Sequence, residues 1–177
     1  MEIEFRILDF LQEIRTPAGD AVMCFITKSG NAGMIWIILA AILLVIPKTK
    51  KSGMVIMAAL CIDLVMCNGI LKNLFTRMRP CDVNTQIQLL IARPDSFSFP
   101  SGHTASSFAA VAALYFSGER KLWKLALVLA CLIAFSRLYL YVHYPTDILG
   151  GIFVGIAAGY MGHAVIRQWL KWNKTLK

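Results

Sequence analysis

The sequence predicts an all-α protein, a polytopic membrane bundle of about five transmembrane helices with amphipathic helices at the N-terminus. Two observations lead to this prediction. The 177 residues are 58% hydrophobic and only 16% charged, with a mean hydropathy of +0.64, which is more apolar than a typical soluble domain. Apolar runs of about 16 to 25 residues also recur along the chain, close to the length that crosses the hydrocarbon core. The length allows one domain over residues 1–177.

Residues 1–28 are expected to form amphipathic helices that lie on the membrane surface. Apolar side chains recur at helical spacing at Ile3, Ile7, Phe10 or Leu11, and Ile14. Thr16 and Pro17 then supply a cap and a proline for the first helical position, which predicts a second short helix to about residue 27. Because the N-terminus is acidic and amphipathic, it does not have the pattern of a cleavable signal peptide.

Residues 32–166 are expected to form the transmembrane core, followed by a basic cytoplasmic tail over 167–177. The five predicted spans are 32–46, 54–75, 101–116, 122–141 and 146–166. Two of them carry small residues at helical spacing, including Gly151, Gly155 and Gly159 on the last and Gly102, Ser106 and Ala110 on the third. Small faces let helices approach closely, either within one chain or between the copies of a homo-oligomer.

The charge distribution predicts the orientation of the bundle. Three connections on one side have net charges of +3 at 48–51, +2 at 119–124 and +4 at 167–177, whereas residues 1–28 have −2 and residues 77–100 have +1. The positive-inside rule therefore places the C-terminus in the cytoplasm and the N-terminus outside. The net charge of +8 comes from short basic clusters beside the apolar spans, which the topology explains, so it does not indicate binding to nucleic acid. The expected partners are membrane lipids.

The cysteines do not predict a metal site. Cys61, Cys67 and Cys131 lie in apolar runs without Cys-x-x-Cys or Cys/His spacing, so no zinc and no other cofactor is expected. Cys24 and Cys81 lie nearer the aqueous boundary, and the sequence leaves their pairing open.

Three polar islands lie at the ends of apolar segments. Residues 72–80 read KNLFTRMRP, residues 100–103 read PSGH, and residues 136–147 read SRLYLYVHYPTD. Polar groups at membrane depth are costly, which makes them functional candidates. The same argument draws attention to Asp63 and Asn68 inside the second span. We interpret Asp63 as lying near a polar cavity or a neighbouring helix, and Asn68 as bracing Lys72 one turn on.

The third island combines Arg137, His143 and Asp147. These side chains offer a cationic fork, an imidazole that titrates near neutral pH, and a carboxylate that can fix the tautomer of the imidazole.

In the first island, Lys72 and Arg79 are seven residues apart, so on a continuous helix ended by Pro80 they would share a face about 10 Å apart. Alone, Lys72 could equally be an interfacial lysine that reaches toward headgroups.

The second island is expected to open a helix at Ser101. A helix N-terminus offers unpaired N–H groups to an anion, Gly102 permits close approach, and His103 can direct an imidazole into the same pocket. Taken alone, Ser101 would be an ordinary N-cap. A lone membrane histidine such as His163 would more often be a packed polar residue.

Together the islands resemble the type 2 phosphatidic acid phosphatase family, whose pattern is Lys, six residues, Arg-Pro; then Pro-Ser-Gly-His; then Ser-Arg, five residues, His, three residues, Asp. All three parts match between Lys72 and Asp147. The resemblance implies a membrane phosphatase that needs no metal and forms a phosphohistidine. Its substrate would be a lipid phosphate or diphosphate, with undecaprenyl diphosphate expected first and phosphatidate or phosphatidylglycerophosphate next.

The resemblance also implies the roles of the matched residues. His143 would be the nucleophile, His103 the proton donor, and Asp147 the partner that orients His143. The phosphate-binding residues would be Lys72, Arg79, Ser101, Gly102 and Arg137. The sequence leaves open a membrane protein that binds or transports phosphate without cleaving it, whereas the apolar spans argue against the soluble vanadate-dependent haloperoxidases. Members commonly have six spans, and the one expected before the N-terminal helices looks absent.

Overall fold

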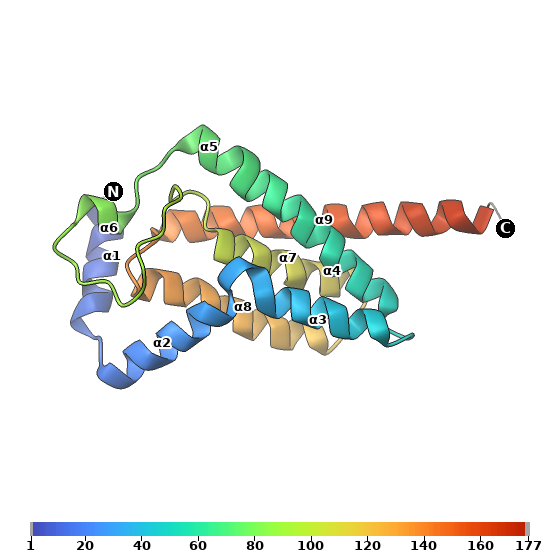
Figure 1. Ribbon diagram of the computed structural model, residues 1–177, viewed down its shortest axis with the longest axis horizontal. Coiled ribbons are helices and arrows are strands. Elements are labelled where there is room, and N and C mark those ends of the chain that lie inside the picture. The colour runs from blue at the N-terminus through green and yellow to red at the C-terminus, as the bar shows by residue number, and fades with distance from the viewer. Residues whose placement is uncertain (1, 176–177) are drawn as a thin grey trace.

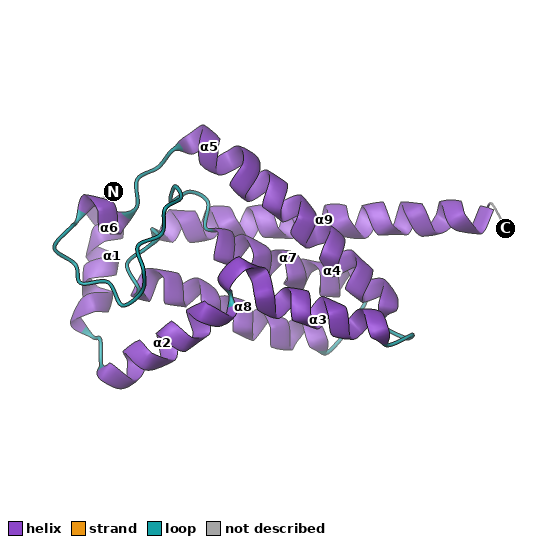
Figure 2. Ribbon diagram, in the orientation of Figure 1, coloured by secondary structure: helices purple, strands orange, loops and turns teal. Residues whose placement is uncertain are grey.

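The computed structural model describes residues 2–175, and over this range the chain is helical with connecting loops (Figures 1 and 2). Five helices run along the length of the bundle: α3 (Met34–Val45), α4 (Lys50–Asp63), α7 (Gly102–Ser117), α8 (Leu122–Tyr139) and α9 (Pro145–Thr175). Helices α1 (Glu2–Glu13) and α6 (Pro80–Val83) lie at one end, together with the loop that follows α6. The all-α prediction is confirmed for the described residues.

Helix α7 forms the centre of the bundle and packs against α4, α8 and α9. Each residue from Thr104 to Leu114 is buried. A Cβ atom added at Gly155 of α9 would lie 2.4 Å from the carbonyl oxygen of Ala105, so the two backbones touch. The predicted close packing of small faces therefore occurs within one chain.

Three helical stretches are long and apolar enough to cross a membrane, namely Lys50–Val83, Leu122–Tyr139 and Pro145–Asn173. Helix α2 (Pro17–Ser29) and the segment Asn31–Val45 are bent by 47° and together form a fourth candidate, as a broken span or a re-entrant loop. The chain is thus a multi-pass membrane protein. Helix α7 has 16 residues, about 24 Å, so the count of five spans stays a prediction.

The second predicted span, 54–75, ends at Phe75 as predicted, and its helix begins earlier than predicted. It begins at Lys50 as α4, becomes the π-helical segment η2 (Leu64–Leu71), and continues as α5 (Lys72–Phe75). Thr76 is left-handed, with a φ of 41°, and it ends the helix. The expectation that Lys72 and Arg79 share one continuous helix is therefore wrong. Pro80 begins α6 instead of ending a helix, because a first helical position does not need the N–H that proline lacks.

Helix α1 lies across one end of the bundle (Figure 1), and its position on the membrane surface stays a prediction. Its predicted apolar stripe points outward, and Ile3, Ile7, Phe10 and Ile14 are 42 to 70% exposed. A neighbouring face, about a quarter of a turn around the helix, is buried and consists of Glu4, Leu8 and Leu11. Leu8 packs in a cluster with the segment that joins α8 to α9. One side of α1 thus faces the surroundings while the other supports the α8–α9 connection.

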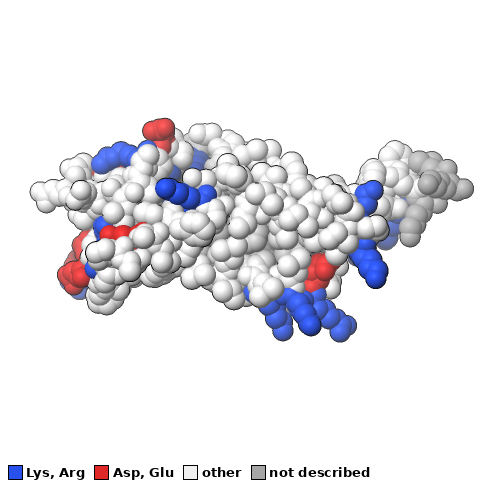
Figure 3. All heavy atoms as spheres, turned by 60° about the horizontal axis from the view of Figure 1, so that its bottom comes forward, with Lys and Arg blue, Asp and Glu red and all other residues white. Residues whose placement is uncertain are grey.

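Helix α9 continues to Thr175, so residues 167–175 of the predicted basic tail are helical. The end of the span at residue 166 and the cytoplasmic position of the tail stay predictions. No proline follows Pro145, and no glycine follows Gly162, so nothing in the sequence stops the helix at residue 166. Residues 176–177 of the predicted tail lie outside the described residues. On the face drawn in Figure 3, a cluster of Lys and Arg lies at the end opposite to α1, as the charge count predicts.

Candidate active site

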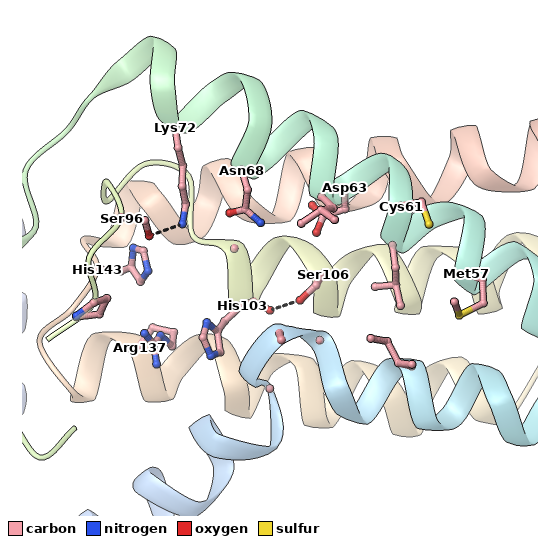
Figure 4. A pocket seen from close by; sticks show the side chains of 18 of the residues that line it. Met57, Cys61, Asp63, Asn68, Lys72, Ser96, His103, Ser106, Arg137 and His143 are labelled. Atoms are coloured by element: carbon pink, nitrogen blue, oxygen red, sulfur yellow. Dashed lines mark hydrogen bonds between the residues drawn. The ribbon is translucent and has the colours of Figure 1, made fainter. Parts of the chain in front are cut away.

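The three polar islands meet at one cavity of about 500 Å³ (Figure 4). Six of the predicted site residues line it: Lys72, Arg79, Gly102, His103, Arg137 and His143. The other two, Ser101 and Asp147, are fully buried directly behind this lining. The fold joins them, because the backbone N–H of Ser101 donates to the carbonyl oxygen of Asp147 across 3.1 Å. The starts of α7 and α9 are thereby held together.

Lys72 and Arg79 converge through the loop before α7, although they share no helix. Lys72 Nζ donates to Ser96 Oγ at 3.0 Å, and Arg79 Nη2 lies 3.1 Å from the same oxygen. Arg79 Nε also donates to the carbonyl oxygen of Ser96 at 2.7 Å. The loop therefore fixes both cations beside the cavity, as Figure 4 shows for Lys72 and Ser96.

His143 is buried between α8 and α9, and its contacts identify its tautomer. Arg79 Nη1 lies 3.1 Å from Nε2 of His143. A guanidinium group can only donate, so Nε2 is the acceptor and the neutral ring carries its proton on Nδ1. Nδ1 lies 3.4 Å from Asp147 Oδ2, an ion-pair distance, but it has no aligned hydrogen bond. Burial, with the guanidinium groups of Arg79 and Arg137, lowers the pKa of His143 to about 3, although Asp147 acts in the opposite direction.

Asp147 is held from both of its oxygens. Oδ2 accepts from Ser98 Oγ at 2.5 Å and from the backbone N–H of Tyr144 at 2.8 Å. Oδ1 accepts from Arg77 Nη1 at 2.6 Å. The carboxylate is fully buried, so these donors compensate for its desolvation and fix its orientation beside His143.

Arg137 approaches the cavity from the last turn of α8. It is 3% exposed and donates from Nη1 to the hydroxyl of Thr27, whereas its Nε atom is buried without a partner. No carboxylate in residues 2–175 forms an ion pair with Lys72, Arg79 or Arg137. Because a buried charge without a partner is costly, this group of cations is suited to an anion.

The start of α7 completes the cavity. Ser101 occupies the N-cap position but makes no capping hydrogen bond, and its hydroxyl accepts from Thr104 Oγ1 at 3.0 Å. A Cβ atom at Gly102 would lie 3.7 Å from Lys72 Nζ, so glycine keeps the space below the lysine open. His103 Nε2 lies 2.9 Å from Asn31 Oδ1, which fixes the ring at the cavity wall.

The far part of the cavity is mainly apolar. It runs between α3, α4 and α7 and is lined there by Ile37, Met57, Leu60 and Leu64. Asp63 and Asn68 also line the cavity. Asp63 thus lies at a cavity, as interpreted from the sequence, although this part of it is mainly apolar, and no hydrogen bond from Asn68 to Lys72 is found. The described residues contain no group of three or more His, Cys, Asp or Glu side chains that could hold a metal ion. The five cysteines, Cys24 and Cys81 included, are free.

Sequence reasoning missed Ser96, which lines the cavity, and the residues that support the cavity from behind, namely Glu4, Thr27, Asn31, Arg77 and Ser98. Arg77 lies inside the first island, two residues before Arg79, and could have been noticed there. Glu4 shares a helical face with Leu8 and Leu11, which is an unusual place for a carboxylate. Nothing in the local sequence marks the others, because their partners are distant in the chain.

Comparison with known proteins is consistent with this geometry. The profile of the PAP2 superfamily matches residues 52–173, more than half of the chain. An undecaprenyl-diphosphatase of Sulfolobus acidocaldarius is 29% identical over 151 residues, which are 85% of this chain and 71% of the relative. A lipid A 4'-phosphatase of Bacteroides thetaiotaomicron is 29% identical over 94% of this chain and 78% of its own length. Phosphatidylglycerophosphatase B of Bacillus subtilis is 31% identical, with coverages of 81% and 73%.

Two solved structures share the fold. LpxE of Aquifex aeolicus has a TM-score of 0.78 and 25% identity, with 90% of this chain and 94% of that chain covered. A transmembrane PAP2-type phosphatidylglycerolphosphate phosphatase of Bacillus subtilis has a TM-score of 0.76 and 28% identity, with coverages of 94% and 86%.

Proposed function

Because the chain belongs to the PAP2 superfamily of membrane lipid phosphatases, we propose that it removes phosphate from a lipid phosphate or diphosphate through a phosphohistidine at His143. The family assignment makes it a membrane hydrolase. The residue roles, the substrate and the side of the membrane are our proposals.

One observation carries the proposal. Lys72, Arg79 and Arg137 surround one cavity without a carboxylate partner in the described chain, and His143 presents an unprotonated Nε2 atom beside them. A phosphoryl group would compensate the three cations and bring phosphorus to Nε2. Such cations also stabilise the charge on the equatorial oxygens in the transition state.

In the proposed mechanism, Arg79 Nη1 exchanges its hydrogen bond to Nε2 of His143 for one to a phosphoryl oxygen of the bound substrate. The freed Nε2 lone pair then attacks phosphorus as the bond to the leaving oxygen breaks. His103 donates a proton to that oxygen. Asp147 stabilises the positive charge that the ring acquires, because the proton on Nδ1 faces its carboxylate. Water then attacks the phosphohistidine, His103 accepts a proton from the water, and phosphate leaves with Nε2 regenerated.

A lipid substrate suits the apolar far part of the cavity, where the tail would lie between α3 and α4. The relatives named above act on polyprenyl diphosphate, lipid A and phosphatidylglycerophosphate. We propose undecaprenyl diphosphate as the substrate, because the Sulfolobus acidocaldarius relative is an undecaprenyl-diphosphatase. Phosphatidate or phosphatidylglycerophosphate is the alternative.

We further propose that residues 32–166 contribute five spans, with the short helix α7 as one of them, and that the cavity opens to the extracytoplasmic side. The net charges of the connections support this orientation, since the basic connections lie at the other end of the bundle. The helices in residues 1–28 would then rest on the outer surface.

Phosphate release by the purified protein, measured over a panel of lipid phosphates and diphosphates, tests the function. We expect turnover that survives EDTA and is inhibited by vanadate, which resembles pentacoordinate phosphorus. The His143→Ala protein is the control and should release no phosphate. Binding of lipid phosphate by the native protein without release would show instead a binding or transport protein. Loss of turnover with EDTA and its recovery with magnesium would contradict the mechanism.

A further inference from the structure

Arg77 lies behind the proposed active site and binds its carboxylate. Its Nη1 atom lies 2.6 Å from Asp147 Oδ1 and 2.6 Å from Thr146 Oγ1. Its guanidinium carbon also stands 4.0 Å from the centre of the Tyr144 ring. Arg77 is absent from the cavity lining, so it can affect the reaction only through the residues it holds.

The other side of the Arg77 guanidinium binds the N-terminal helix. Nη2 lies 2.9 Å from Glu4 Oε2, in an ion pair whose side chains are 24% and 10% exposed. The second carboxylate oxygen of Glu4 accepts from Thr146 Oγ1 at 2.6 Å. Glu4 thus contacts both Arg77 and the residue before Asp147, although it lies more than 140 positions earlier in the chain.

We propose that Arg77 and Glu4 are positioning residues for the phosphatase reaction, and that the N-terminal surface helix is therefore part of the catalytic apparatus. This inference rests on the proposed function. In the proposed network, Glu4 orients Arg77 and Arg77 holds Oδ1 of Asp147. Asp147 in turn presents Oδ2 to Nδ1 of His143.

The need for such positioning follows from the distance between the last two groups. Oδ2 of Asp147 is 3.4 Å from Nδ1 of His143 and not yet aligned for a hydrogen bond. The contact has to tighten when phosphoryl transfer makes the ring cationic. A small rotation of the carboxylate would lengthen the contact, and the bond from Arg77 to Oδ1 opposes that rotation. A forked guanidinium can bind two carboxylates at once, which a lysine cannot do with the same geometry.

The packing of helix α1 on the bundle holds Glu4 in place. Leu8 and Leu11 are buried on the same face as Glu4, while Ile3, Ile7 and Phe10 point away from the protein. The position of Glu4 thus depends on how the whole helix is seated at this end of the bundle.

Turnover of four variants tests the proposal, with KM, kcat and vanadate inhibition measured for each. Arg77→Ala should lower kcat by roughly 10- to 100-fold, by analogy with the outer hydrogen-bond partners that orient metal ligands in metalloenzymes. KM should change little, because the phosphate-binding cations remain, whereas vanadate inhibition should weaken together with kcat, because vanadate resembles the transition state that Asp147 and His143 stabilise. Arg77→Lys should fall between Arg77→Ala and the native protein. Glu4→Ala should lower kcat by about 10-fold, at the weak end of the same range.

Glu2→Ala is the matched control, because it removes the same charge from the same helix. Glu2 is exposed and pairs only with Arg6 among the contacts found, at 2.9 Å with side chains 77 and 83% exposed. The Glu2→Ala variant should leave kcat unchanged. The double variant Glu4→Ala/Arg77→Ala should be no slower than Arg77→Ala, because both residues act through Asp147.

Several outcomes would overturn the proposal. If Glu4→Ala has the same kcat as Glu2→Ala, the contacts of Glu4 only support the fold. If Arg77→Ala raises KM and weakens vanadate inhibition while kcat is unchanged, Arg77 contributes to phosphate binding instead of positioning Asp147. Multiplicative losses in the double variant would also contradict a single path through Asp147. These outcomes require an active native protein, so they differ from a failure of the proposed function, in which native protein and variants alike release no phosphate.

Discussion

Nη1 of Arg79 lies 3.1 Å from Nε2 of His143, so the ring nitrogen that faces the cations of the cavity is the one without a proton. The other nitrogen faces Asp147. The two ring nitrogens therefore have different environments, and only one of them can serve as the nucleophile. This relationship predicts the site of phosphorylation at the level of a single atom.

We expect the phosphoryl group of a trapped intermediate to be on Nε2 of His143. Rapid quenching of the native protein with labelled substrate, followed by alkaline digestion and separation of the two phosphohistidine isomers, measures this directly. His143→Ala should trap no label, because nothing remains to accept the phosphoryl group. Label on Nδ1 would mean that the ring flips before it reacts and that Asp147 does not fix the tautomer.

The sequence predicted the helical class from local patterns, whereas the convergence of the islands at one site was implied by the resemblance to a known family. Apolar runs identify helices that can cross a membrane, and polar residues at their ends mark functional candidates. The route from Lys72 to Arg79 was predicted wrongly because the left-handed turn at Thr76 has no sequence signal, since a β-branched residue rarely adopts a positive φ. The two cations converge nonetheless, because Ser96 binds both.

The supporting residues could not be predicted for a different reason. Glu4 and Arg77 are 73 positions apart, and Arg137 and Thr27 are 110 apart. Spacing arguments relate residues within one element or its neighbours, whereas these pairs form only when the N-terminal helices dock on the bundle. The position of α1, and hence its contribution to the site, follows from tertiary packing.

The contact between α7 and α9 should be sensitive to a single methyl group. Gly155→Ala would place a Cβ atom 2.4 Å from the carbonyl oxygen of Ala105, so we expect a loss of about 1–3 kcal/mol in stability. Gly69→Ala is the matched control, since its Cβ atom would meet only Leu64 O at 4.0 Å. Thermal unfolding in detergent should show a lower midpoint for the first protein and an unchanged or higher midpoint for the second. Equal midpoints would contradict the close packing.

The orientation of the bundle can be tested with an impermeant thiol reagent on intact cells. In a background in which the five natural cysteines are replaced by alanine, Gln88→Cys in the exposed loop before α7 should be labelled from outside. Lys48→Cys, which is also exposed but lies in the connection between α3 and α4, should be labelled only after the cells are lysed. The reverse pattern would place the cavity on the cytoplasmic side.

The last prediction separates the two histidines of the cavity by their dependence on the leaving group. His143 faces Asp147, whereas the observed partner of the His103 ring is an amide, Asn31 Oδ1 at 2.9 Å. We therefore expect His103→Ala to retain reactivity toward p-nitrophenyl phosphate, because a leaving group of low pKa needs little protonation. On a lipid phosphate the same variant should lose about 10²–10⁴-fold in kcat, the usual contribution of a proton donor.

His143→Ala is the comparison for this prediction, because a protein without its nucleophile should lose activity on both substrates alike. Steady-state rates on the two substrates give the ratio directly, and rapid quenching shows whether His103→Ala still forms the phosphoenzyme. If acid-labile label accumulates on His143→Ala and is absent from His103→Ala, the two roles are reversed. If His103→Ala loses the same factor on both substrates, then His103 positions phosphate or supports the cavity wall, and the leaving oxygen takes its proton from another group.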